Sequence, residues 1–367
     1  MGRQRVTLAD VAKASGVSPT TASLVLTGRG RALRISHAAE RRVRDAAQEL
    51  GYRRHAVADG PRGARTRTVG LITDFVVSSL LAGDMVRGAA EAAGGRGCVL
   101  FTGESGGDPE VERSLVEAMR DHRVDGIVFA SMFTRRVIVP KGLEDGPAVL
   151  LNALPVGRSS LPSVLPDEVQ AGRAAARVLV EAGHREGIHL IGAGPELHRV
   201  PARSIAAVER LVGIHEVFAR AGVTVAGGRP CGDWSPDNGY DATRELLRRG
   251  RPSALLCFND RLAFGAYQAL ADAALSVPDD VAVMSFDDHP IASWLRPRLT
   301  TVVLPHHRLG ATAVEVLFAA AERRGRLAET AAVHRVPMPV RTGGSVKAVT
   351  APLVHLGHRD CARSHLS

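Results

Sequence analysis

Several features that define large protein classes are missing from this 367-residue sequence. No apolar run reaches the ~18–20 residues that a membrane-spanning helix needs. The first 16 residues lack the apolar core of a secretion signal, so we expect none. The four cysteines are far apart and form no CxxC pair, which argues against a disulfide framework and favours a reducing cytoplasm. The apolar share of 45% is that of a globular protein, and the length predicts two or three folded units.

Lysine is also scarce, so arginine carries almost all of the positive charge; the lysines are Lys13, Lys141 and Lys347. The positive surplus is confined to one end of the chain. Residues 1–70 hold 14 basic and 5 acidic side chains, a net charge of +9, whereas residues 71–367 hold 33 of each sign. A genome-wide arginine bias would explain the scarcity of lysine but not the position of this surplus. A basic head on a neutral body predicts that the head contacts a polyanion, and guanidinium groups suit phosphate and guanine.

The first 50 residues have the pattern of three short helices. Thr7 is a candidate N-cap for the first, and apolar residues then recur at helical spacing. Gly16 permits a tight turn, after which Ser18 is a second N-cap with Pro19 at the first helical position. Ser36 begins a third helix. Two short helices joined by such a turn predict a helix-turn-helix.

The run VTLADVAKASGVSPTTASLVLTGRG, followed by RIS and RVRDAAQELGYR, resembles the LacI family of bacterial transcriptional regulators. The resemblance extends to about Ser345. It implies a cytoplasmic homodimer, or a tetramer, whose second helices enter successive major grooves of a near-palindromic operator. It also implies a periplasmic-binding-protein-like body that binds a small-molecule effector, and a repressor rather than an activator.

The resemblance places the base-reading residues in the second helix, at Pro19, Thr20 and Leu24, while Thr21 and Ser23 match positions that contact the DNA backbone or support the helix. A leucine can only pack on apolar edges such as the thymine methyl, so specificity would depend more on Thr20 and on DNA shape. Packing within the head, without a base contact, is the alternative for Leu24. The residues that we expect at the DNA are Thr7, Ser18, Pro19, Thr20, Thr21, Ser23, Leu24, Arg29, Arg34, His55, Ala56 and Pro61.

Residues 55–67 form the linker. The resemblance implies a short hinge helix here that orders on DNA, with a leucine inserted into the minor groove at the dimer axis. Pro61, preceded by Gly60, stands at the position of that leucine, and proline shortens a helix. Proline can itself act as a wedge between bases. A plain flexible linker is the alternative.

From Thr68 onward, short β-branched runs alternate with amphipathic helices. This alternation predicts an α/β body, and about ten such units predict two doubly wound parallel sheets. Ligands of such folds bind beyond the carboxyl ends of the strands. We expect a DNA-binding domain at 1–54, a linker at 55–67, a first lobe at 68–164 plus 304–327, a second lobe at 165–303 plus 328–345, and a disordered tail at 346–367. The tail holds His355, His358, Cys361 and His365 at a spacing that zinc could use, but disorder is the simpler interpretation.

The resemblance carries over six effector-binding positions, which are Asp74, Asn152, Arg210, Trp234, Asn259 and Asp287. Acidic and amide side chains at strand ends can bind ligand hydroxyls, arginine can bind an anion or several hydroxyls, and a tryptophan face accepts sugars and bases. The alternatives are structural: packing for Trp234, an ion pair for Arg210 and a loop role for Asp287. Aspartate is frequent in relatives at Asn152, so we expect the first-lobe side of the site to be less polar than in those relatives. This departure argues against a simple sugar site, and a sugar or nucleoside remains the expected effector.

No cofactor and no metal are expected. Gly192 and Gly194 follow a strand, as in a dinucleotide-binding loop, but the third glycine and the acidic partner are missing. Without a P-loop, a GxSxG motif or a nucleophile–base pair, the sequence argues against an enzyme. The rival to a regulator is a small-molecule-binding protein with a weak or vestigial DNA-binding head.

Overall fold

The computed structural model describes residues 6–26, 33, 35–50, 66–77, 83–200, 204–322 and 332–347. The chain divides into two compact units, of which one is Met1–Thr68 with Ala118–Asp125 and the other is the remainder. Across these described ranges, no helix is both long enough and apolar enough to cross a membrane.

The N-terminal head contains three helices, α1 (Leu8–Ser15), α2 (Pro19–Leu26) and α3 (His37–Glu49). The predicted N-cap at Thr7 is confirmed as part of a capping box, because its hydroxyl accepts from the Asp10 backbone N–H while the Asp10 carboxylate accepts from the Thr7 N–H. Gly16 ends α1 with a left-handed φ of 65°, and Ser36 caps α3. The apolar stripes of the helices meet in a small core of Val11, Ala12, Ala22, Val25, Val43, Ala46 and Ala47.

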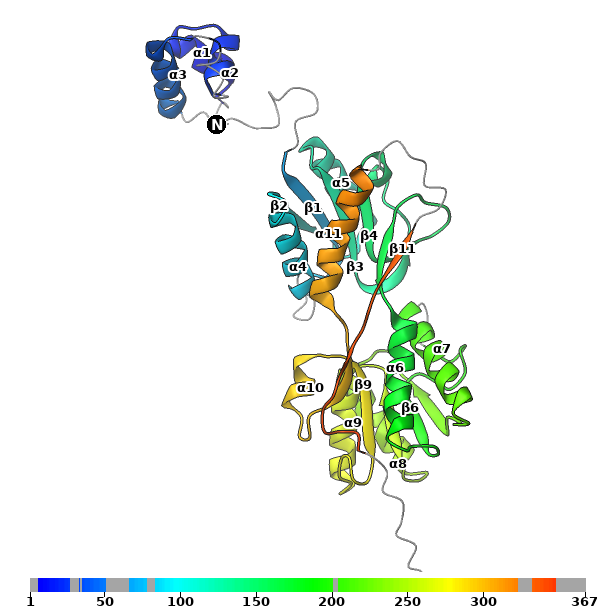
Figure 1. The fold of residues 1–367 in the computed structure, drawn as a ribbon. Coiled ribbons are helices and arrows are strands. Elements are labelled where there is room, and N and C mark those ends of the chain that lie inside the picture. The colour runs from blue at the N-terminus through cyan, green and yellow to red at the C-terminus, as the bar shows by residue number, and fades with distance from the viewer. Residues whose placement is uncertain are drawn as a thin grey trace, which may run out of the picture. The chain divides into compact units, whose positions relative to one another are not determined.

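The body contains two six-stranded sheets (Figure 1). The first has the order β11-β5-β4-β3-β1-β2 and the second has the order β12-β10-β9-β8-β6-β7, so the two repeat one doubly wound order. The first-sheet strands are β1 (Thr68–Thr73), β2 (Val99–Glu104), β3 (Gly126–Val137), β4 (Ala148–Pro155), β5 (Ser163–Pro166) and β11 (Val333–Val336). The second-sheet strands are β6 (Ile188–Gly192), β7 (Gly227–Pro230), β8 (Ala254–Cys257), β9 (Ala282–Asp287), β10 (Thr300–Val303) and β12 (Val340–Arg341). The predicted α/β architecture with two parallel-sheet lobes is confirmed.

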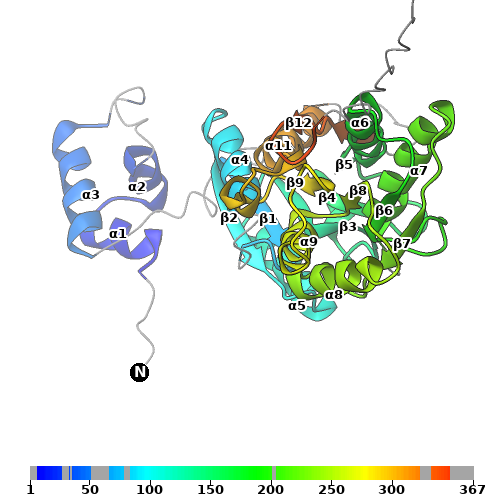
Figure 2. The same cartoon turned by 90° about the horizontal axis from the view of Figure 1, so that it is seen from below.

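Helices cover both sheets. In the first lobe they are α4 (Gly83–Gly94), α5 (Pro109–Asp121), the 3-10 turn Leu143–Asp145 and α11 (His306–Glu322). In the second lobe they are α6 (Glu168–Glu181), α7 (Ile205–Arg220), α8 (Pro236–Leu247), α9 (Asp260–Asp272) and α10 (Pro290–Trp294). Figure 2 shows α8 beside α9, and α6 with α7 across the second sheet from them. Strand β8 is fully buried between these layers, and β9 is buried from Ala282 to Phe286.

Three helix pairs pack through reciprocal glycines: α4 with α11, α6 with α7, and α8 with α9. In the second pair, a Cβ on Gly172 would lie 2.1 Å from the Arg210 carbonyl oxygen, and a Cβ on Gly213 would lie 2.0 Å from the Val169 carbonyl oxygen. Only glycine lets the two backbones come this close without movement. The packing of α6 on α7 therefore fixes the backbone of Arg210 in the second lobe.

One predicted boundary needs correction. We expected residues 328–345 in the second lobe, but β11 pairs in parallel with β5 of the first sheet, and the chain crosses to the second sheet between Val336 and Val340. The physical reason is that β5 offers an unpaired edge to Val333–Val336, with Val333 aligned on Ser163. The chain also passes from the first lobe to the second at Asp167, between β5 and α6. These two crossings lie side by side, because the Asp167 N–H donates to the Val336 carbonyl at 2.9 Å.

Candidate functional site

The start of α2 presents polar side chains to solvent. Ser18, Pro19 and Thr20 are exposed, and Thr21 and Ser23 are partly exposed. The Ser18 hydroxyl accepts from the Thr21 backbone N–H at 3.1 Å and lies 2.8 Å from Thr21 Oγ1, so Ser18 is the N-cap of α2. An ordered, exposed helix N-terminus presents N–H groups and a positive dipole end, which suit phosphate.

Leu24 is partly buried, and the next residue, Val25, lies in the core of the head. This position is compatible with both interpretations of Leu24, so its contact with a base stays a prediction. Thr7 is exposed at the start of α1, and its contact with DNA also stays a prediction. The remaining residues expected at the DNA lie outside the described residues, and they are Arg29, Arg34, His55, Ala56 and Pro61.

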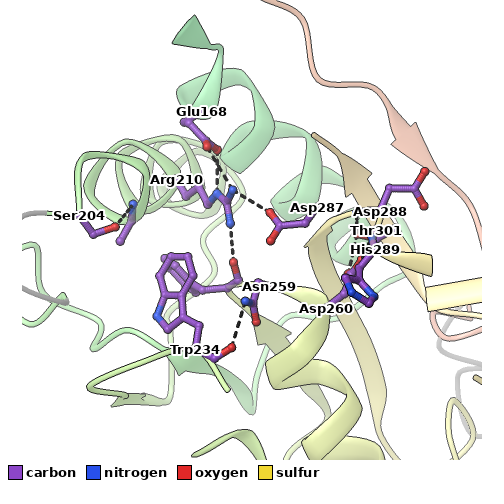
Figure 3. A network of polar contacts seen from close by, with 12 residues as sticks. Glu168, Ser204, Arg210, Trp234, Asn259, Asp260, Asp287, Asp288, His289 and Thr301 are labelled. Atoms are coloured by element: carbon purple, nitrogen blue, oxygen red, sulfur yellow. Dashed lines mark hydrogen bonds and ion pairs between the residues drawn. The ribbon is translucent and has the colours of Figure 1, made fainter. Parts of the chain in front are cut away.

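Arg210 is the centre of a buried network in the second lobe (Figure 3). Its side chain is 2% exposed. Nε donates to Glu168 Oε2 at 2.7 Å, and Nη2 donates to Glu168 Oε1 and to Asp287 Oδ1, both at 3.1 Å. Nη1 donates to the Phe258 carbonyl oxygen. Four of the five guanidinium N–H groups therefore bind the protein itself, which is the ion-pair alternative that the sequence left open.

Aromatic rings surround the same guanidinium, whose carbon lies 4.5 Å from the Phe286 ring centroid and 5.7 Å from that of Trp234. Burial opposes the charged form of Arg210, but Glu168 and Asp287 outweigh this effect and raise its pKa. Burial raises the pKa of Glu168, although Arg210 opposes the rise. Because both Glu168 oxygens accept arginine N–H groups, the contact fits the carboxylate form.

Asp287 has an unusual backbone. Its φ is 105°, and that of the next residue, Asp288, is 55°. Such values are rare outside glycine and cost of order 1–3 kcal/mol each. The Asp287 side chain is 29% exposed, and within the described part of the chain its Oδ2 atom accepts no hydrogen bond. Strained backbone that holds an available carboxylate oxygen is typical of a binding site.

Trp234 and Asn259 complete this network. Trp234 Nε1 donates to the Gly192 carbonyl at 3.1 Å, and its ring packs edge-on against Phe258 at a centroid distance of 5.9 Å. Asn259 Oδ1 caps α9 by accepting from the Leu262 N–H, and its Nδ2 donates to the Trp234 carbonyl at 3.2 Å. These contacts lie at the carboxyl ends of β6 and β8, where the strand order reverses and where such folds bind ligands.

The two first-lobe positions are more enclosed. Asp74, 6% exposed, accepts from the backbone N–H groups of Phe75 and Met132 and pairs with Arg135 at 3.2 Å. Asn152 is 2% exposed with a φ of 53°, and its Oδ1 has no hydrogen-bond partner among the described residues. The structure thus joins four of the six predicted positions in one network, while Asp74 organises its own loop and Asn152 lies in β4.

Sequence reasoning missed Glu168 and Asp260. Glu168 begins α6, where an acid usually faces solvent and offsets the helix dipole, yet it is 2% exposed. Asp260 begins α9 and is fully buried. Its Oδ1 accepts from Thr301 Oγ1 at 2.8 Å and its Oδ2 accepts from the His289 N–H at 2.7 Å, which ties α9 to β10 and to the turn after β9 (Figure 3). Two adjacent polar residues after an apolar strand, Asn259 and Asp260, were the available signal.

Asp260 predicts a pH-dependent stability. Burial, followed by the charge of Asp287, raises the pKa of Asp260 to about 7, above its ordinary 3.8. The folded state therefore holds this proton more tightly than the unfolded state, so the contribution to stability is complete below about pH 4 and is lost as the pH rises through 7. We expect the wild type to lose about 2 kcal/mol of unfolding free energy, relative to Asp260→Asn, between about pH 5.5 and pH 8.

Denaturant unfolding across this pH range measures the difference. Asp241→Asn, at an exposed aspartate on α8, is the control and should follow the wild-type curve. Parallel curves for the wild type and Asp260→Asn would contradict the assignment.

Comparison with protein families matches both parts of the chain. Residues 7–55 match the model of the bacterial regulatory proteins of the lacI family, and residues 176–346 match a periplasmic binding protein-like domain. The chain is 31% identical to the ribose operon repressor of Escherichia coli (strain K12) over 316 residues, which cover 85% of this chain and 92% of that protein. It is 28% identical to the transcriptional repressor PurR of Vibrio atlanticus (strain LGP32) over 323 residues, covering 85% and 90%.

Solved structures agree with this result. The lac repressor dimer bound to operator and the anti-inducer ONPF is 25% identical, has a TM-score of 0.72 and covers 94% of this chain and 100% of that chain. The complex of the regulator CelR with cellobiose is 26% identical, has a TM-score of 0.62 and covers 93% and 100%. These relatives are regulators rather than enzymes, and the helix-turn-helix and effector-domain predictions are confirmed. The chain belongs to the LacI family, and it is a DNA-binding transcriptional regulator with an effector-binding body.

Proposed function

We propose that this chain represses transcription as a cytoplasmic homodimer and reads a near-palindromic operator through Pro19, Thr20 and the exposed start of α2. The polar, exposed N-terminus of α2 and the net charge of +9 on residues 1–70 support this role. The lac repressor structure that it resembles is a dimer bound to operator. Its relatives include a ribose operon repressor and a regulator solved in complex with cellobiose, so the proposed effector is a sugar or a nucleoside, and the sugar has the more direct support.

The effector is proposed to bind at the carboxyl ends of β6, β8 and β9. Asp287 Oδ2 would accept a ligand hydroxyl, the fifth N–H of Arg210 would donate, and the Trp234 ring would pack on the apolar face of the ligand. Asn259 would hold Trp234 in place, and Asp74 and Asn152 would contribute from the first lobe. The observation that carries this proposal is the strained, partly exposed Asp287 held by a buried arginine.

The same site adjoins a crossing between the lobes. The Leu304 N–H donates to the Asp287 carbonyl at 3.3 Å, and Leu304 directly follows β10 on the way to α11 of the first lobe. A ligand on Asp287 would therefore act where the lobes are joined. It changes operator affinity to the extent that it binds one lobe arrangement better than the other.

Two screens on the full-length protein test the proposal. Selection from a random duplex library should yield a near-palindromic sequence with two half-sites. Thermal unfolding with a panel of sugars, nucleosides and their phosphorylated counterparts should identify a stabilising ligand, because binding to the folded state alone raises Tm. Recovery of no preferred sequence would contradict the DNA role and favour a small-molecule-binding protein with a vestigial head.

A further inference from the structure

The charges around Arg210 do not balance. One guanidinium faces two carboxylates, those of Glu168 and Asp287, so the network carries one surplus negative charge. Glu168 is as buried as Arg210, at 2% exposure, and both of its oxygens are bound to the guanidinium. An arginine in a binding site often binds an anionic group of the ligand. Here the charge of Arg210 is already neutralised by carboxylates of the protein itself.

Among the described residues, the ion pairs beside this network do not restore the balance, because each pair is neutral by itself. Asp288 is paired with Arg341, and Glu209 is paired with Arg335 through two contacts of 2.6 Å. Burial lowers the pKa of both His289 and His306, which favours their neutral forms at neutral pH. Asp260, packed beside the turn after β9, adds further negative charge whenever it is ionised.

We infer that Glu168 determines the charge class of the effector: the site selects a hydroxyl-rich ligand that is uncharged or positively charged, and it rejects phosphorylated or carboxylated analogues. The hydrogen-bonding atoms on offer agree with this assignment. Asp287 Oδ2 accepts only, and Arg210 retains a single N–H, so a ligand must supply donors and cannot form a bidentate anion contact. In a buried setting of low polarity, an added anion would face the unpaired charge with little screening. This inference rests on the proposed location of the effector.

Tryptophan fluorescence can measure this local charge. It has two tryptophans, Trp234 beside Arg210 and Trp294 on α10, of which the latter is 69% exposed. Trp294→Phe leaves Trp234 as the single emitter, and Trp234→Phe leaves Trp294 as the matched control. Quenching by iodide, acrylamide and caesium at constant ionic strength then compares an anion, a neutral molecule and a cation at each position, without any effector.

We expect the ratio of the iodide to the acrylamide quenching constant to be at least about threefold lower at Trp234 than at Trp294. The ratio of the caesium to the acrylamide quenching constant should instead be higher at Trp234 than at Trp294. Glu168→Gln, which removes one charge while keeping a hydrogen-bond acceptor, should raise the iodide ratio at Trp234 about twofold or more. Equal ratios at the two tryptophans in the otherwise wild-type chain would overturn the inference, and that comparison does not depend on whether Glu168→Gln folds. An unchanged ratio in folded Glu168→Gln would remove Glu168 as the determinant.

The ligand panel gives an independent reading. Compounds that raise Tm should be uncharged or amine-bearing, and their phosphorylated counterparts should be at least about tenfold weaker. A phosphate- or carboxylate-bearing compound as the tightest ligand would overturn the inference while leaving the proposed regulatory function intact. Conversely, weak iodide quenching at Trp234 together with no DNA sequence recovered from the duplex library would support the charge assignment and contradict the proposed role as a regulator.

Discussion

Arg210→Met should lower the free energy of unfolding of the body by about 3–5 kcal/mol. Methionine fills much of the volume but leaves Glu168 and Asp287 without a cation, and the Glu168 side chain is only 2% exposed. Removal of one partner from a buried ion pair leaves an uncompensated charge, which costs far more than the pair itself contributes. Denaturant unfolding of the full-length protein measures the loss.

Two variants make this prediction specific. Arg173→Met breaks a pair between the same two helices, α6 and α7, but Arg173 and Glu216 are 30% and 34% exposed, so we expect a loss below about 1 kcal/mol. The double variant Arg210→Met with Glu168→Gln should recover part of the stability, because the stranded buried charge is gone. Equal losses for Arg210→Met and Arg173→Met would show that burial of the network has no energetic weight.

Operator affinity should fall steeply with salt. Residues 1–70 carry a net charge of +9, and binding through arginine–phosphate contacts releases counterions from the DNA. For about 6–10 phosphate contacts, the association constant should fall by about 10³–10⁵ between about 50 and 200 mM salt. Fluorescence anisotropy with the selected duplex, repeated across salt concentrations, gives this slope.

Substitutions of single arginines distinguish the contribution of the head to this salt dependence from that of the body. Arg29→Ala is expected to reduce the slope by about one phosphate contact. Arg113→Ala, in a surface cluster with Glu110 and Glu117 on α5, should leave it unchanged. A flat salt dependence in the wild type would argue against phosphate contacts as the source of affinity.

Much of the fold follows from local patterns. Helix α6 begins and ends where local signals place it, because Asp167 caps its start and Gly183 follows its end with a left-handed backbone. Strands β8 and β9 are apolar runs bounded by turns, and this local pattern predicts buried strands.

Other elements depend on their neighbours. Strand β7 has the sequence Gly-Gly-Arg-Pro, which has no intrinsic preference for a strand, and it pairs only because β6 offers an edge. The short strand β12 likewise forms beside β10. Spacing along the chain contains no information about these pairings.

The site shows the same division. The family resemblance identified Asn259 and Asp287, and both lie at the carboxyl ends of apolar strands, where polar residues meet at one edge of a parallel sheet. The burial of Glu168 could not be inferred, because its partner is 42 residues away and reaches it only when α7 packs on α6. Four N–H groups of Arg210 bind groups of the protein itself, which determines the charge of the site. These contacts could be identified only from the folded structure.

We propose that a ligand binds to the body at Asp287 and that this binding changes the affinity of the head for DNA. The most direct test of this proposal is the affinity of the full-length protein for the selected operator, with and without the stabilising ligand, in the wild type and in Asp287→Asn. The account predicts a change of about 5–150-fold in the wild type, and little or no change in Asp287→Asn at unaltered ligand-free affinity. An operator affinity that is the same with and without saturating ligand in the wild type would contradict it.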